Sequence, residues 1–90
     1  MTPPSYRRRP GVPWRRSLDA VLCLPPGASE PVTLVGSGPE VWDLLERPCS
    51  LDEMASELAR WHRIDAEAVA RDVGPLLERL AELRLVVPVL

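Results

Sequence analysis

Apolar residues change their spacing near residue 36, and this change divides the chain into two parts. Seven of the eleven prolines fall at or before Pro31, so the first part is not expected to be helical. Three apolar segments lie among these prolines, and they predict short strands at residues 12–15, 20–24 and 32–35. The links between them are short, which favours an antiparallel meander with the third strand at a sheet edge.

Beyond residue 36, apolar residues recur with the 3.6-residue period of a helix. A serine followed three residues later by a glutamate is the pattern of a capping box, and it occurs at Ser37 and at Ser50. These positions predict the starts of two helices, and Asp65 is a suitable N-cap for a third. The sequence therefore predicts an α+β fold, a three-stranded antiparallel sheet followed by three helices, which resembles a winged helix-turn-helix with its strands first.

The third helix is predicted to carry the largest apolar face. Its members lie within about a third of the helix circumference: Val69, Val73, Leu76, Leu77, Leu80 and Leu83. Pro75 is expected to kink this helix rather than break it, because the apolar phase is the same on both sides. The apolar residues 85–87 are predicted to pack on the sheet or to form a short wing.

The net charge of −2 hides a strong asymmetry. Residues 1–16 hold five arginines and no acidic residue, whereas residues 17–90 hold six arginines and thirteen acidic residues. We therefore expect a flexible basic arm over residues 1–9 and a single domain over residues 10–90. The longest apolar run has five residues, and the arginine-rich start does not lead into an apolar segment. Neither a membrane span nor a signal peptide is predicted, and the expected location is the cytoplasm.

Few side chains are placed for chemistry. His62 is the single histidine, and the two cysteines, Cys23 and Cys49, are far apart in the sequence. Because no pairing of nucleophile with base and no metal-ligand spacing is present, we predict no enzyme activity, no metal site and no cofactor. Residues 65–85 hold three arginines and five acidic residues, which disfavours nucleic acid as a partner of the third helix. A winged-helix nucleic-acid-binding protein stays an alternative because the N-terminal arm is basic.

Several segments follow one another in an order and spacing typical of a known family. They are residues 18–22, residues 32–35, residues 41–45 around Trp42, residues 50–53 with Leu58 and Ala59, and residues 71–73 with Leu77 and Leu80. On these segments residues 10–87 resemble the PqqD-like leader-peptide-binding domains, also called RiPP recognition elements. The short separate chain and its start rich in arginine and proline look most like the stand-alone leader-binding proteins of lasso-peptide pathways. A free-standing PqqD of pyrroloquinoline quinone synthesis is the near alternative.

The resemblance implies a function in peptide recognition. Such domains bind the leader segment of a ribosomally synthesised precursor peptide by adding it to the edge of the third strand. In lasso pathways they present it to a separate leader peptidase, which a cyclase follows, so these are the implied partners, with no nucleic acid and no membrane. The implied leader-binding residues lie on the third strand and on one flank of the third helix: Val32, Thr33, Leu34, Val35, Asp72, Leu76, Arg79 and Leu83. The sequence leaves open which strand positions face outward and which helix flank faces the edge.

Overall fold

The computed structural model describes residues 3–89. Three strands near the N-terminus form an antiparallel sheet in the order β2-β3-β4: β2 (Trp14–Ser17), β3 (Ala20–Cys23) and β4 (Val32–Leu34). Three helices follow: α1 (Gly38–Leu44), α2 (Leu51–His62) and α3 (Ala66–Glu82). The predicted α+β fold, a three-stranded antiparallel sheet followed by three helices, is therefore confirmed. The third predicted strand, β4, lies at an edge of its sheet as expected.

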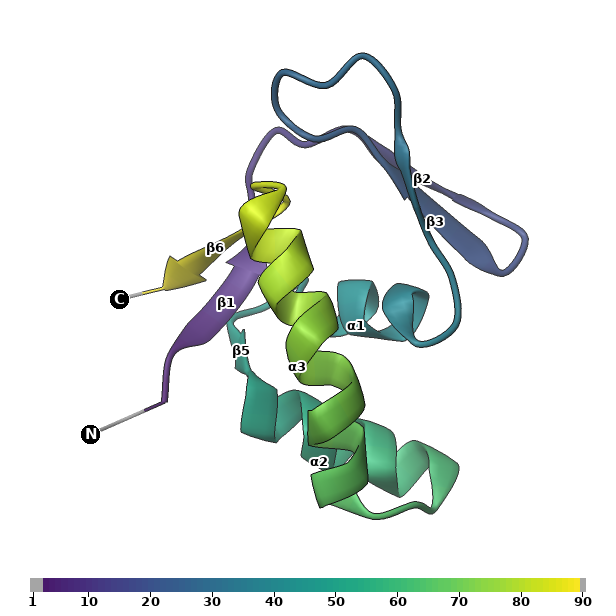
Figure 1. Ribbon diagram of the computed structural model, residues 1–90, viewed down its shortest axis with the longest axis vertical. Coiled ribbons are helices and arrows are strands. Elements are labelled where there is room, and N and C mark those ends of the chain that lie inside the picture. Colours follow the sequence, from purple (N-terminus) through teal and green to yellow (C-terminus); the bar gives the residue numbers. More distant parts are fainter. Residues whose placement is uncertain (1–2, 90) are drawn as a thin grey trace.

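A second small sheet joins the two ends of the chain. Its strands are β1 (Ser5–Arg8), β5 (Cys49–Ser50) and β6 (Val86–Val89), in the order β5-β1-β6. Figure 1 shows this sheet on one side of α3, with the β2–β3 hairpin extending on the other side. The apolar residues 85–87 thus continue into a strand that pairs antiparallel with β1.

The predicted flexible arm over residues 1–9 is wrong for residues 5–8, which form β1. The partner that orders this segment is β6, about eighty positions later in the chain, and no local pattern near the N-terminus reveals such a partner. Tyr6 packs against the core, and Arg8 is half-buried. Residues 1 and 2 of the predicted arm lie outside the described residues.

Arg8 fastens β1 and β2 to the first helix. Its guanidinium lies 4.7 Å from the ring centroid of Trp14 and 5.0 Å from that of Trp42, and these two rings meet edge to face at 5.9 Å. Its Nε donates a hydrogen bond of 2.8 Å to the carbonyl oxygen of Trp42, near the C-terminal end of α1. Helix ends leave such carbonyls without an intrahelical partner, so Arg8 supplies one from another element.

The three helices begin in different ways. At α2 the predicted capping box is confirmed, because Ser50 Oγ accepts from the amide of Glu53 at 3.1 Å and Glu53 Oε1 accepts from the amide of Ser50 at 2.9 Å. At α1 the predicted capping box is wrong: Ser37 has helical backbone angles, φ −78° and ψ −10°, and its side chain makes no capping bond. A capping serine needs an extended backbone to aim its hydroxyl at the third helical amide. Asp65 caps α3 as predicted.

The third helix runs without a break through Pro75. Four of its predicted core residues are buried: Val69, Val73, Leu77 and Leu80. Leu76 and Leu83 are half-buried and pack against the same core. The centre of that core is Trp42, whose side chain is fully buried. One core therefore supports both the helices and the β2-β3-β4 sheet.

Candidate functional site

The register of the β2–β3 hairpin establishes which backbone groups of β3 face β2. The hairpin closes through two residues, Leu18 and Asp19, and in such hairpins the pair next to the turn exchanges both backbone hydrogen bonds. Backbone direction alternates along a strand, so Leu22 and Leu24 also turn their N–H and C=O groups toward β2. The amide of Leu24 indeed donates to the carbonyl oxygen of Pro13 at 3.0 Å.

The same alternation identifies the outward-facing residue of β4. Val21 and Cys23 of β3 turn their backbone groups toward β4, where they stand opposite Leu34 and Val32. Thr33 lies between these two residues, so its N–H and C=O groups face away from β3. Among residues 3–89 no other strand pairs with this side of β4. Thr33 therefore presents one donor and one acceptor to any strand that is added there.

A close approach between β4 and α1 holds this edge in place. The side chain of Leu34 is buried, and a Cβ built on Gly38 at the start of α1 would lie 2.9 Å from the Cβ of Leu34. Any larger residue at position 38 would force the strand and the helix apart. Between them, the amide of Gly38 donates to the carbonyl oxygen of Val35 at 2.9 Å, which forms the tight turn after β4.

A hollow of about 310 Å³ lies at the end of β4. Its lining comes from the loop after β4, from α1, from the end of α2 and from the first half of α3: Gly36, Ser37, Glu40, Leu58, His62, Ile64, Val69, Asp72 and Val73. Three of these side chains, on α2 and α3, are buried and form an apolar floor. Ile64, in the link between α2 and α3, is 55% exposed, so the hollow is an apolar surface open to solvent.

The rim of this hollow is acidic. Nε2 of His62 lies 2.8 and 2.9 Å from the two carboxylate oxygens of Glu40, and this contact joins the end of α2 to α1. Asp72 on α3 is exposed and makes no ion pair with another described residue. The hollow thus carries two carboxylates and one imidazole around an apolar floor, which suits an apolar side chain near a positive charge.

The structure brings together some of the residues that the sequence suggested and not others. Thr33 is exposed on the open edge, Val32 is half-buried, Leu34 is buried in the core, and Val35, just beyond β4, is 67% exposed.

On α3, Asp72 lines the hollow together with the loop that follows β4. The remaining three suggested helix residues lie elsewhere: Leu76 and Leu83 pack against the core, and Arg79 lies 3.7 Å from Glu82.

Sequence reasoning missed most of the hollow. Glu40 and His62 come from different helices, twenty-two positions apart, and no local pattern signals their contact. The spacing of Ser37 and Glu40 instead predicts a helix cap. Ile64 offers no usable signal, because single apolar residues are common on protein surfaces.

The cysteines contribute packing rather than reactive groups. Both side chains are buried and neither forms a disulfide. Burial raises the pKa of the Cys23 thiol to about 11, although the Arg8 guanidinium opposes this shift. Burial, with the carboxylates of Glu53 and Glu57, also raises the pKa of Cys49. Because the thiolate is the nucleophilic form, both side chains are poorly suited to covalent chemistry at neutral pH.

The fold and the site together define a small α+β domain with an open sheet edge next to an apolar hollow, a class of surface that suits extended peptides. The family model described as Coenzyme PQQ synthesis protein D (PqqD) matches residues 21–86. This match spans most of the chain, and the chain belongs to the PqqD family, a family of RiPP recognition elements. No curated protein and no solved structure matches the chain.

Membership in the family supports a general role in recognition of precursor peptides, because PqqD domains bind peptides and are not themselves catalytic. The matched region begins in β3 and ends in β6, so it includes β4, the hollow and all three helices. None of the helices within residues 3–89 combines the length and the apolar character needed to cross a bilayer.

Proposed function

We propose that this protein binds the leader segment of a ribosomally synthesised precursor peptide at the open edge of β4. The leader adds to the sheet as a fourth strand and is presented to a separate leader peptidase in lasso-peptide biosynthesis. The observation that supports this most directly is the outward-facing backbone of Thr33 beside an apolar hollow. The chain itself acts as a binding protein rather than an enzyme.

Strand addition divides the recognition between backbone and side chains. Hydrogen bonds to Thr33 give attraction that does not depend on the leader sequence, each contributing about 0.5–1.5 kcal/mol. Selectivity comes from leader side chains that enter the hollow between the β4–α1 loop and α3. In this proposal Val35 and Asp72 contact the leader directly, whereas Val32 and Leu34 support the edge from the β3 side.

The role of a PqqD chaperone in pyrroloquinoline quinone synthesis is a second candidate, because the description of the matching family names that pathway. Both roles use the same edge and differ in the precursor that is bound. Binding of synthetic leaders from the precursor genes beside this gene distinguishes them. Binding of a lasso leader, and not of a quinone precursor, supports the first role.

A proline scan of β4 tests strand addition, because proline removes one backbone donor. Thr33→Pro removes a donor that faces outward, so we expect the fold to persist while leader affinity falls by about 1–3 kcal/mol, or roughly 5- to 150-fold. Val32→Pro and Leu34→Pro remove donors that hold β4 to β3, so we expect both variants to unfold. Thr33→Val, which keeps the donor, is the matched control.

The readouts are circular dichroism melting for the fold and fluorescence anisotropy with the labelled leader for binding. A folded Thr33→Pro variant that binds the leader as tightly as Thr33→Val would contradict strand addition at this edge. Presentation is tested separately, with the leader peptidase encoded beside this gene. We expect the peptidase to cleave the precursor faster when this protein is present, and this protein alone to leave the precursor intact.

A further inference from the structure

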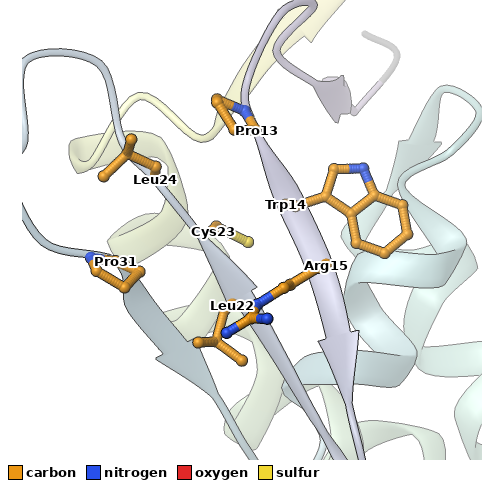
Figure 2. A pocket seen from close by; sticks show the side chains of 7 residues that line it. All are labelled: Pro13, Trp14, Arg15, Leu22, Cys23, Leu24 and Pro31. Carbon is orange, nitrogen blue, oxygen red and sulfur yellow. The ribbon is translucent and has the colours of Figure 1, made fainter.

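The outer face of the β2-β3-β4 sheet carries a second hollow that the proposed leader site does not use. Residues that stand opposite one another share a face, so Arg15 and Leu22 point away from the core that holds Val21 and Leu34. A hollow of about 240 Å³ lies here. Figure 2 shows the Arg15 side chain directed from β2 toward Leu22 on β3.

This hollow continues into a neighbouring one. This neighbouring hollow, of about 320 Å³, is formed by the β1–β2 link and the β3–β4 link. It shares Pro13 and Leu24 with the hollow of about 240 Å³. We call the combined surface the proline-lined face, and define it by Arg9, Pro13, Arg15, Leu22, Leu24 and Pro31. Four of these six residues are leucine or proline, and Pro31 directly precedes β4.

The charge of the proline-lined face is entirely positive. No aspartate or glutamate among the described residues lines either hollow, and Arg9 and Arg15 make no ion pair with any described residue. Two arginines of β1 and β2 differ from Arg9 and Arg15 in this respect. Arg16 lies 2.6 Å from Asp43, and Arg8 lies 3.8 Å from the same carboxylate. The charges of Arg9 and Arg15 are therefore available to a partner.

We infer that the proline-lined face docks an acidic segment with apolar side chains that belongs to the leader peptidase. This inference rests on the proposed function and adds the surface at which the second protein binds. Two unpaired arginines beside leucine and proline surfaces match a segment in which carboxylates alternate with apolar residues. Nucleic acid fits less well, since a surface with two arginines and several apolar side chains contacts few phosphates.

The position of the face permits a complex of three components. The leader adds to the β4 side of the sheet, whereas Arg9 and Arg15 belong to the β1–β2 side. The leader would therefore pair with the outer edge of β4, whereas the peptidase segment would lie on the face of the sheet near β2. Holding both on one small domain raises the local concentration of the cleavage site near the enzyme.

Charge reversal at Arg15 tests the inference with the full-length protein. We expect Arg15→Glu to weaken binding of the leader peptidase encoded beside this gene by about tenfold or more, while affinity for the labelled leader stays within about twofold. Arg47→Glu is the matched control, because Arg47 is exposed, carries the same charge and lines neither hollow. We expect it to change neither affinity. Leu22→Thr replaces an apolar side chain with a more polar one that also suits a strand, so it should weaken peptidase binding without a change in charge.

The outcomes separate this inference from the proposed function. Loss of peptidase binding in Arg15→Glu, with leader binding kept, supports the inference. Three outcomes overturn the inference and leave leader binding intact. Arg15→Glu and Arg47→Glu lose peptidase affinity equally, neither variant loses it, or the native protein does not bind the peptidase. A parallel loss of leader binding in Arg15→Glu overturns it too, because the face then belongs to the leader site. Binding of a 20-base-pair DNA duplex in place of the peptidase, abolished by Arg15→Glu, assigns the face to nucleic acid and also overturns it.

Discussion

The two edges of the β2-β3-β4 sheet have surroundings of opposite charge. Beside β4 the hollow is lined by the carboxylates of Glu40 and Asp72, whereas near β2 the proline-lined face carries the guanidinium groups of Arg9 and Arg15. The strands differ in burial as well. All four residues of β2 are exposed, but β4 alternates between half-buried, exposed and buried positions.

This difference would let one small sheet offer distinct surfaces to the two peptides that we propose it binds. An unpaired strand edge attracts any extended chain through its backbone, so the edge alone selects nothing. In our proposals, selection comes from the side chains around it, from an acidic rim on one side and a basic face on the other. The net charge of −2 conceals this division, because the two regions largely cancel.

The largest expected effect concerns the core that both regions share. Trp42 is fully buried under the sheet, and Trp42→Ala should lower the free energy of unfolding by about 3–5 kcal/mol, with leader and peptidase binding lost together. Its Nε1 has no hydrogen-bond partner among the described residues, so Trp42→Phe removes an unsatisfied donor and should cost only about 1 kcal/mol. Urea denaturation of both variants measures this contrast. Similar losses in the two variants would mean that the indole nitrogen has a partner such as a buried water.

A second prediction concerns the stability of β3, which lies between the two edges. Burial raises the pKa of Cys23 from its ordinary 9.0 to about 11, so the folded protein retains this proton while the unfolded chain loses it. The resulting stability is fully present below pH 9 and is lost as pH rises toward 11, by about 2–3 kcal/mol. The free energy of unfolding is measured for the native protein and for Cys23→Ala at several pH values between about 8 and 11. The difference between the two curves isolates the contribution of Cys23. An identical pH slope in both proteins would show that Cys23 does not cause it.

A third prediction separates the basic side from the leader side. Arg8→Met removes the hydrogen bond to the Trp42 carbonyl and the contacts with the faces of Trp14 and Trp42, so we expect a loss of about 1–2 kcal/mol in stability. We expect the structural change to be confined to β1 and β2, and only peptidase binding to weaken. Leader binding should be unaffected, because β4 is held by the contact between Leu34 and Gly38. Arg7→Met, at an exposed position of the same strand, should change stability by less than about 0.5 kcal/mol. Leader affinity that falls with Arg8→Met would show that the two sides are not independent.

Local patterns predicted the elements of the fold better than their long-range partners. The Ser50 capping box and the periodic face of α3 were predicted correctly because each depends on residues a few positions apart. The strand β1 was missed because its partner β6 lies at the other end of the chain. The Ser37 capping box failed because Ser37 has helical backbone angles, and the Glu40 side chain that would complete the box lies against His62 of another helix.

The candidate site shows the same division. The segment that forms β4 and its place at an edge followed from the sequence, but the outward direction of Thr33 required the register with β3. On α3 the flank that the resemblance implies includes Asp72, which lines the hollow, and also Arg79, which does not line it. Periodicity identifies which face of a helix is apolar, but the neighbour of each flank depends on how the helices cross.

The smallest expected effect tests the acidic character of the leader side. Asp72 is exposed and makes no ion pair with a described residue, so a basic residue of the leader can approach it. Asp72→Asn keeps the size and polarity of the side chain, and we expect leader affinity to fall about two- to fivefold, as for an exposed charge pair of roughly 0.4–1 kcal/mol. The effect should shrink at high salt, since exposed charges are screened.

Asp52→Asn is the matched control, because Asp52 is also exposed but lines a different hollow, beside β1. Equal affinities for the Asp72→Asn and native proteins at low salt would show that apolar contacts and the β4 backbone alone select the leader, and that the acidic rim does not contribute.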